Sequence, residues 1–182
     1  MKRIFTFLLI AFSLVSCSKN DSPKYSGESV ITTRLYISGS DYITYGFSFK
    51  KAKNIPYSMS MQTNDFVDII ALPLTDNENK LTGVIFSSTP QNDKAFLTNG
   101  EFSDENTAIS FFNNYKEVTG FLFKPLSDTI KVYQVLTYKS LTPTYAKILI
   151  TSVKFLPDNL TGQYAEVTFR WVYQPDGTTL FP

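Results

Sequence analysis

Apolar and polar side chains alternate along most of this sequence, and that period of two constrains the fold more than any other feature. The longest alternating segments are YAKILITSVKFL (residues 145–156) and QYAEVTFRWVYQ (residues 163–174), separated by the turn-forming residues PDNLTG. This arrangement predicts an antiparallel hairpin. Successive residues of a strand point to opposite faces, so one face of the second segment is predicted to be core. Its members are Ala165, Val167, Phe169, Trp171 and Tyr173.

Shorter segments with strand patterns are spread over the rest of the chain, and together they predict an all-β, mainly antiparallel fold. They are ESVITTRLYIS (28–38), YITYGFSFK (42–50), DFVDIIALPL (65–74), LTGVIFSS (81–88), GFLFKPL (120–126) and IKVYQVLTY (130–138). One face of the first is predicted to carry Ile31, Thr33, Leu35 and Ile37. The third is more continuously apolar, which is typical of a buried strand, and it is predicted to end at Pro73.

One segment departs from this period. In SDENTAISFFNNY (residues 103–115), apolar residues recur at helical spacing. Ser103 or Asp104 can cap the first turn, and Glu105 lies near the positive end of the helix dipole. The pattern predicts one short helix over residues 104–115, packed on a sheet.

Residues 1–16 have the features of a secretory signal peptide, because Lys2 and Arg3 precede a short apolar run. The run is shorter than the roughly 20 apolar residues that a membrane-spanning helix needs. The following Leu14-Val15-Ser16-Cys17 is similar to the lipobox of bacterial lipoproteins, in which the cysteine becomes the first residue of the mature chain and is acylated. Cys17 is therefore the predicted site of lipid attachment and membrane anchoring.

Residues 17–29 are small and polar, so they are predicted to form a flexible tether. Residues 30–182 are predicted to form a single β-rich domain. Ser18 follows Cys17 in place of the aspartate that retains many lipoproteins in an inner membrane. These residues do not decide between the periplasmic and the surface face of an outer membrane. With 17 basic and 16 acidic residues the chain has no basic stripe, and this excludes nucleic acid as a partner.

Histidine is absent from all 182 residues. This excludes histidine-based catalytic triads, histidine-ligated zinc and haem held by two histidines. Asp65 and Asp68 invite a paired-carboxylate interpretation, but at three residues apart on a strand they face opposite sides. We therefore expect a protein that is not an enzyme.

Two segments, TYAKILI (144–150) and YAEVTFRWVYQPDG (164–177), resemble the closing hairpin of the HmuY-like haem-binding lipoproteins of Bacteroidetes. Tyr145, Lys147 and Ile148 stand at the places of a Tyr-x-Lys-apolar motif in that family. The segments KVYQVLTY and YGFSFKKAKNI look like two of its other strands. The resemblance implies an all-β fold of two packed sheets, an outer-membrane lipoprotein, and capture of haem for delivery to a partner transporter.

The best-known members of that family hold the iron with two histidines, and some relatives use methionine. Met59 and Met61, in PYSMSMQ, point to the same side of a strand, whereas axial ligands approach the iron from opposite faces. The candidate ligand-binding residues are therefore Tyr57, Met59 and Met61, as one methionine with the tyrosine, since tyrosine can ligate haem iron. In the alternative interpretation, both methionines fill space in a core or an apolar groove.

Other polar residues have two interpretations each. Asp76 and Glu78 could bind calcium or lie in a solvated turn. Lys147 could be catalytic or could lie on a sheet face with its stem buried, and Trp171 could stack on a sugar or fill the core. The alternative function is a structural or interaction lipoprotein, accessory to an outer-membrane nutrient-uptake system. An apolar pocket lined by aromatic residues and Met59 or Met61 would favour ligand binding.

Overall fold

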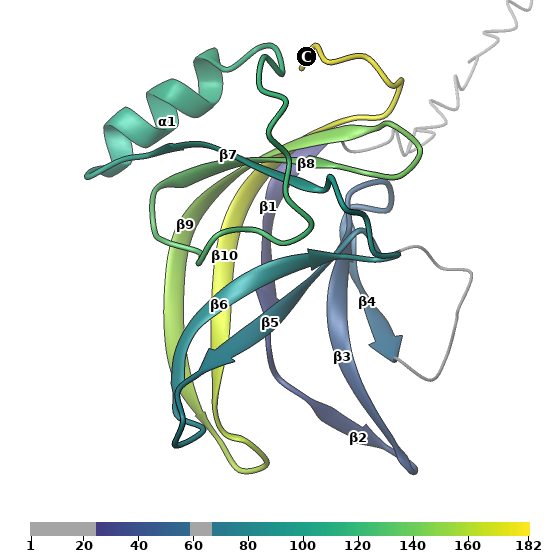
Figure 1. Ribbon diagram of the computed structural model, residues 1–182, viewed down its shortest axis with the longest axis vertical. Coiled ribbons are helices and arrows are strands. Elements are labelled where there is room, and N and C mark those ends of the chain that lie inside the picture. The colour runs from purple at the N-terminus through teal and green to yellow at the C-terminus, as the bar shows by residue number, and fades with distance from the viewer. Residues whose placement is uncertain (1–24, 59–66) are drawn as a thin grey trace, which may run out of the picture.

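The computed structural model describes residues 25–58 and 67–182, which form two antiparallel sheets and one short helix (Figure 1). The first sheet has the strand order β1-β10-β9-β8-β7. Its strands are β1 (Ser26–Thr32), β10 (Gly162–Gln174), β9 (Tyr145–Asp158), β8 (Gln134–Lys139) and β7 (Phe96–Glu101). The second sheet has the order β2-β3-β5-β6, with β4 paired to β3. Its strands are β2 (Tyr36–Ser38), β3 (Asp41–Ser48), β4 (Lys53–Ser58), β5 (Ile69–Thr75) and β6 (Leu81–Ser88).

The predicted all-β fold with one short helix is confirmed. The predicted hairpin is formed by β9 and β10, which pair from Tyr145 and Gln174 to the tip between Asp158 and Gly162. The core face of β10 is buried as predicted, and its members are Ala165, Val167, Phe169, Trp171 and Tyr173. The two sheets meet through aromatic rings that pack edge to face or tilted, as such rings prefer.

The segment predicted as one strand over residues 28–38 is divided in two. β1 begins at Ser26, inside the stretch predicted to be a tether, because its first residues pair with the end of β10. It ends at Thr32, and Thr33 then bonds Ala165 twice, through Thr33 N–H to the Ala165 oxygen and from Ala165 N–H to Thr33 Oγ1, both 2.9 Å. The chain turns there into the other sheet. Leu35 and Ile37 are consequently exposed, whereas the prediction placed them on one face with buried Ile31 and Thr33.

β5 does not end at Pro73 as predicted but continues to Thr75, with Pro73 paired to Val84 of β6. Proline lacks an N–H, so a strand accommodates it where one edge has no partner. β3 pairs with β5 at Ile69 alone, so no strand in the described part of the chain pairs with that edge of β5 at Pro73.

Residues 120–126 were also predicted to form a strand, but they lie in the connection between the helix and β8. This connection makes isolated bridges to both sheets. Lys124 pairs with Phe96 of β7, and Leu126 pairs with Ser87 of β6. The connection therefore covers one edge of each sheet, and exposed edges are the parts of a sheet that most need cover.

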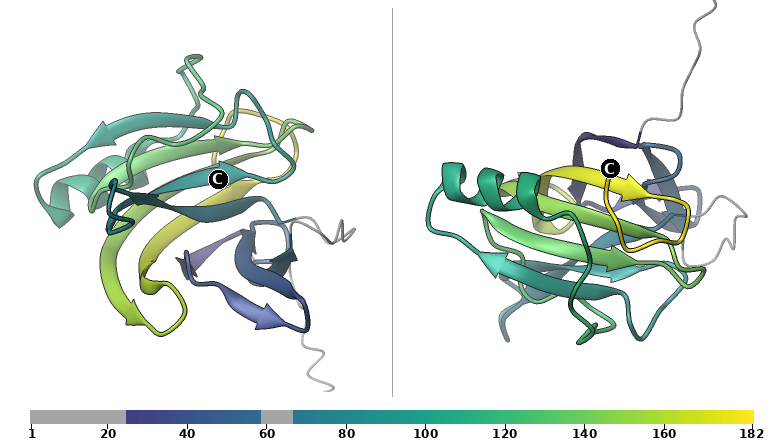
Figure 2. Two further views of the ribbon diagram at one scale, coloured as in Figure 1. Left: turned by 60° about the horizontal axis from the view of Figure 1, so that its bottom comes forward. Right: turned by 90° about the horizontal axis from the view of Figure 1, so that it is seen from above.

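The predicted helix is confirmed as α1 (Glu105–Asn114), which lies on the outer face of the first sheet (Figure 2). Its cap is Asp104, whose Oδ1 accepts a hydrogen bond of 2.9 Å from Thr107 N–H. Its buried side chains, Ala108 and Phe112, pack on β8 and β9. Within the part of the chain that the structure describes, no helix is both long and apolar enough to cross a membrane.

Lys147 of β9 lies under α1 and is only 2% exposed. Its ammonium donates to the carbonyl oxygens of Phe112 at 2.7 Å and Tyr115 at 2.9 Å. These carbonyls lie at the C-terminal end of the helix, where a positive charge is favoured. Burial lowers the pKa of Lys147 to about 8. Lys147 therefore fixes the helix to the sheet, and its donors are used in that role.

Asp68 lies just before β5, and its largely buried carboxyl group joins the two sheets. Its Oδ2 accepts a hydrogen bond of 2.7 Å from Phe49 N–H, and the hydroxyl of Tyr138, in β8, also bonds the carboxyl group. Burial is the largest influence and raises the pKa of Asp68 to about 6, although these hydrogen bonds oppose the rise. The folded protein therefore holds this proton more tightly than the unfolded chain does.

The raised pKa predicts how stability depends on pH. The contribution of Asp68 is fully present below its unfolded pKa of about 4 and is lost as pH rises through the folded value of about 6. Wild type should therefore lose about 1–3 kcal/mol relative to Asp68→Asn over this range, because asparagine keeps the acceptor and never ionises. Urea unfolding of both proteins at several pH values measures the difference. If the two curves run parallel, Asp68 does not titrate as described.

Candidate ligand-binding site

β3 has two different neighbours along one of its edges. β4 pairs with β3 from Ile43 to Ser48 and so occupies one edge over this stretch. β2 also pairs with Ile43, and β5 pairs with Phe47, so both must lie on the other edge. Among the described residues, no strand pairs with that edge at residues 44–46. β3 and β5 therefore diverge beyond Phe47 and leave a gap in the sheet (Figure 1).

A cavity of about 840 Å³ opens at this gap. Its apolar lining is Leu35, Tyr42, Tyr57, Ile70, Ala71, Leu72, Pro73 and Leu81. Its polar lining is mainly hydroxyl and amide groups, and its charged residues are Asp41 and Lys80. Ala71 belongs to the main core between the sheets, whereas Ile70 belongs to a smaller cluster that includes Tyr57. The cavity touches both clusters, so it passes through the gap and is not confined to one face of the sheet.

Gly46 permits β3 and β5 to meet beside the gap. A Cβ atom at this position would lie 2.1 Å from Val67 Cγ1 and 2.7 Å from the Ile69 carbonyl oxygen. Both distances are far shorter than real contacts, so only glycine fits without movement of the backbone. The close approach at Gly46 fixes where the two strands separate.

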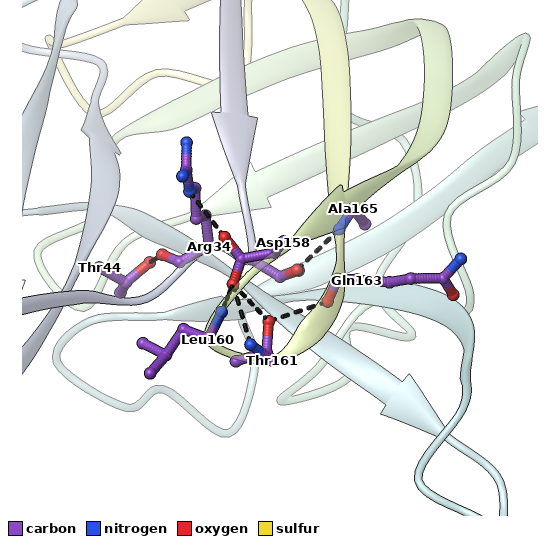
Figure 3. A network of polar contacts seen from close by, with 8 residues as sticks. Arg34, Thr44, Asp158, Leu160, Thr161, Gln163 and Ala165 are labelled. Carbon is purple, nitrogen blue, oxygen red and sulfur yellow. Dashed lines mark hydrogen bonds and ion pairs between the residues drawn. The ribbon is translucent and has the colours of Figure 1, made fainter.

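Asp158, at the end of β9, organises the tip of the hairpin (Figure 3). Its Oδ2 accepts hydrogen bonds from Leu160 N–H at 3.1 Å, Thr161 N–H at 3.0 Å and the Thr161 hydroxyl at 2.9 Å. Its Oδ1 accepts a hydrogen bond of 3.0 Å from Arg34 Nε, in the connection between β1 and β2. The Arg34 carbonyl oxygen in turn accepts from the Thr44 hydroxyl of β3 at 3.2 Å. This network joins three walls of the cavity.

Neighbouring hydrogen bonds and aromatic rings stabilise the ion pair of Arg34 and Asp158. Hydrogen bonds from Thr161 have the largest effect on Asp158 and, with the charge of Arg34, lower its pKa, so the carboxylate stays ionised at neutral pH. The guanidinium also lies 5.3 Å from the ring centres of both Tyr36 and Tyr164. The side chain of Asp158 is only 3% exposed, and that of Arg34 is 43% exposed.

The structure places Tyr57 in the wall of the cavity. Met59 and Met61 lie outside the described residues, as do Cys17 and Asp65. The cavity therefore has the aromatic residues Tyr42 and Tyr57 in its wall, while the part played by the methionines stays a prediction.

The other candidates have structural surroundings. Asp76 Oδ1 accepts from the N–H groups of Glu78 at 3.0 Å and Lys80 at 2.9 Å, which is the geometry of a turn. In residues 25–58 and 67–182, no group of three or more histidine, cysteine, aspartate or glutamate side chains could hold a metal ion. Trp171 is buried in the core beside Phe47, with ring centres 5.4 Å apart.

The sequence analysis did not identify Arg34, Gly46 or Asp158 as residues that shape the site. Gly46 carried a usable signal, because an isolated glycine in a strand pattern often marks a close backbone approach. Arg34 and Asp158 are 124 positions apart, and no local pattern connects them.

A scan against protein-family models found no match to this chain, and a search of curated proteins found none either.

The close approach at Gly46 predicts a marked loss of stability in Gly46→Ala. The new methyl group would force β3 and β5 apart, which should cost about 1–3 kcal/mol in urea unfolding. Gly83→Ala is a matched control, because its Cβ would meet the methyl group of Thr129 at 3.1 Å, and that side chain can shift. Equal losses in the two variants would contradict a special role for Gly46.

Proposed function

We propose that this chain is a lipid-anchored, non-catalytic protein of the bacterial cell envelope that binds a ligand in the cavity at the gap between β3 and β5. The observation that carries the proposal is the cavity of about 840 Å³ at the gap in the second sheet. Binding sites for small molecules have volumes of roughly 300–1,000 Å³ and are mostly apolar, with a few polar groups that orient the ligand. The wall described above has this composition.

Haem is the first ligand to test, because the C-terminal hairpin resembles that of the HmuY-like lipoproteins. Tyr145 and Lys147, which carry that resemblance, are buried in β9 and belong to the scaffold. The cavity supplies Tyr57, whose phenol oxygen is a known type of iron ligand. The apolar wall suits the faces of a macrocycle. In this proposal haem is cargo that the protein holds and releases to an outer-membrane transporter.

The direction of the chain supports capture from the side away from the anchoring membrane. β1 starts at the end of the molecule where α1 and the C-terminus lie, and it runs toward the opposite end (Figure 1). Thr33 and Leu35, which follow β1, line the cavity at the opposite end. A tether from Cys17 would therefore join the domain at the end far from the cavity.

The alternative is an interaction protein without a small ligand. Ile37 and Tyr42 form a cross-strand pair beside the cavity, and they are 62% and 60% exposed. Exposed apolar residues gathered at one place are typical of surfaces that contact a partner. In this alternative the cavity and its rim would receive part of another protein.

Titration of the purified protein with haemin, followed by absorbance, tests the ligand. We expect Tyr57→Phe to weaken haemin binding by at least about tenfold. Loss of even a supporting interaction around a metal ion typically costs 10–100-fold in affinity. The Soret band of wild type should differ from that of a complex with two imidazole ligands, since the chain has no histidine. Affinity should also show little loss near pH 6, where histidine ligands would become protonated.

Tyr42→Phe is the matched control, because it removes a hydroxyl from another tyrosine of the same cavity. Equal effects of the two substitutions would remove Tyr57 as the iron ligand. If haemin binds no better than it does to an unrelated β protein, haem is not the ligand, and the interaction protein becomes the better proposal.

The lipid anchor has a separate test. We expect Cys17→Ala to accumulate as an unprocessed precursor or to leave the membrane fraction, and to take up no labelled palmitate, because the acylated thiol is gone. Cell fractionation and labelling measure this. A variant that is labelled and fractionates like wild type would contradict lipid attachment at Cys17.

A further inference from the structure

Among residues 25–58 and 67–182, no strand pairs with the backbone on either side of the gap between β3 and β5. Ile69 turns its backbone groups toward β3, where it pairs with Phe47. Backbone groups of an antiparallel strand alternate in direction, so Ala71 and Pro73 turn theirs to the same side, where β3 has already diverged. By the same rule Tyr45 of β3 faces the gap from the other side.

Two backbone hydrogen bonds of the neighbouring Asp68 fix the direction in which the backbone groups of β5 point. Asp68 N–H donates to the Phe47 oxygen at 2.9 Å, and the Asp68 oxygen accepts from Thr89 N–H, next to β6, at 3.0 Å. The carbonyl of Asp68 and the backbone groups of Ile70 therefore point toward β6. The backbone groups of Ile69 and Ala71 point toward the side of β3. Proline at position 73 agrees, because the missing N–H falls on the edge without a partner.

We propose that an extended, uncharged polypeptide segment of a partner protein enters the gap and adds a strand to the free edge of β5. This inference rests on the proposed function of the cavity as a binding site, and it takes a peptide in place of haem as the ligand. Addition of a strand to an open edge is a common way for a domain to recognise a peptide. The N–H and carbonyl of Ala71 and the carbonyl of Pro73 supply the backbone bonds.

The lining matches the two faces of a strand. Successive side chains of an added strand would point to opposite faces of the sheet. On one face they would meet Tyr57, Ile70 and Leu72, which form the smaller apolar cluster. On the other face they would meet Leu81 and the hydroxyl of Thr33. A strand with apolar residues on one face and small polar residues on the other fits this lining.

Charge and length narrow the ligand further. Asp41 lies at the beginning of β3 and Lys80 just before β6, and the rest of the lining is uncharged. A charged residue in the middle of the segment would lose its hydration without a partner. The free edge of β5 runs from Ala71 to Thr75, so it accommodates about five residues at roughly 3.3 Å each.

A tethered peptide tests the proposal. Cys17→Ser removes the only cysteine of the chain, and Thr75→Cys places a unique thiol at the end of the free edge. A capped peptide of alternating valine and threonine, attached there by a disulfide, reaches a high effective concentration. The control peptide has the same side chains with every internal amide methylated. Amide hydrogen exchange of Ala71, followed by NMR, reports on the edge, and Leu72, which pairs with β6, reports on the fold.

Without peptide, Ala71 should exchange much faster than Leu72. The unmodified peptide should slow amide exchange at Ala71 by at least about tenfold. The methylated peptide should not slow it, because it has no amide N–H groups to donate and its carbonyl groups lack the geometry of a strand. Ala71 as slow as Leu72 without peptide, or equal effects of the two peptides, would overturn strand addition. Haemin titration of the same protein separates the failures, because tight haemin binding would leave the cavity as a ligand site while strand addition fails.

Discussion

The single pairing between Phe47 of β3 and Ile69 of β5 is the contact on which the shape of the cavity end depends. On one side of it, Gly46 lets the two backbones approach so closely that no side chain fits between them. Beyond it, β3 exchanges its neighbour β5 for β2, and the sheet opens. A sheet that continued its pairing would have no gap. The cavity therefore follows from a strand that has two partners on the same edge.

The long hairpin of β9 and β10 gives this opening a fixed wall. Its core face carries Phe169 and Trp171 against Phe47, which ties the hairpin to the same strand that borders the gap. Its tip extends past the end of the core, where Asp158 gathers the turn and binds Arg34. The hairpin is thus a structural element at one end and part of the site at the other.

The elements with strong local patterns were predictable from sequence, and the site mostly was not. The hairpin, the helix cap and the buried face of β10 depend on residues close in sequence. The spacing of their apolar residues and their turn-forming residues can be recognised in the sequence itself. The break after Thr32 was missed because it depends on Ala165, which bonds Thr33 from a distant strand. The prediction that the strand ends at Pro73 is wrong, because an edge without a partner cannot be recognised before the sheet order is known. Tyr57 is a predicted ligand-binding residue because tyrosine can ligate haem iron. Its position in the cavity depends on the gap in the sheet, which the sequence does not predict.

The two ends of the domain are held by different kinds of interaction, and this difference bears on binding. At the end near α1, Lys147 and Asp68 make buried hydrogen bonds, which are costly to break because they would leave polar groups unpaired in the core. At the cavity end, the contact between Arg34 and Asp158 involves a side chain that is 43% exposed, and ion pairs with exposed partners contribute only about 0–1 kcal/mol. Loss of the contact between Arg34 and Asp158 therefore costs less than any opening of the main core. Under the proposed function, a ligand that enters the gap would displace this contact while both sheets stay intact.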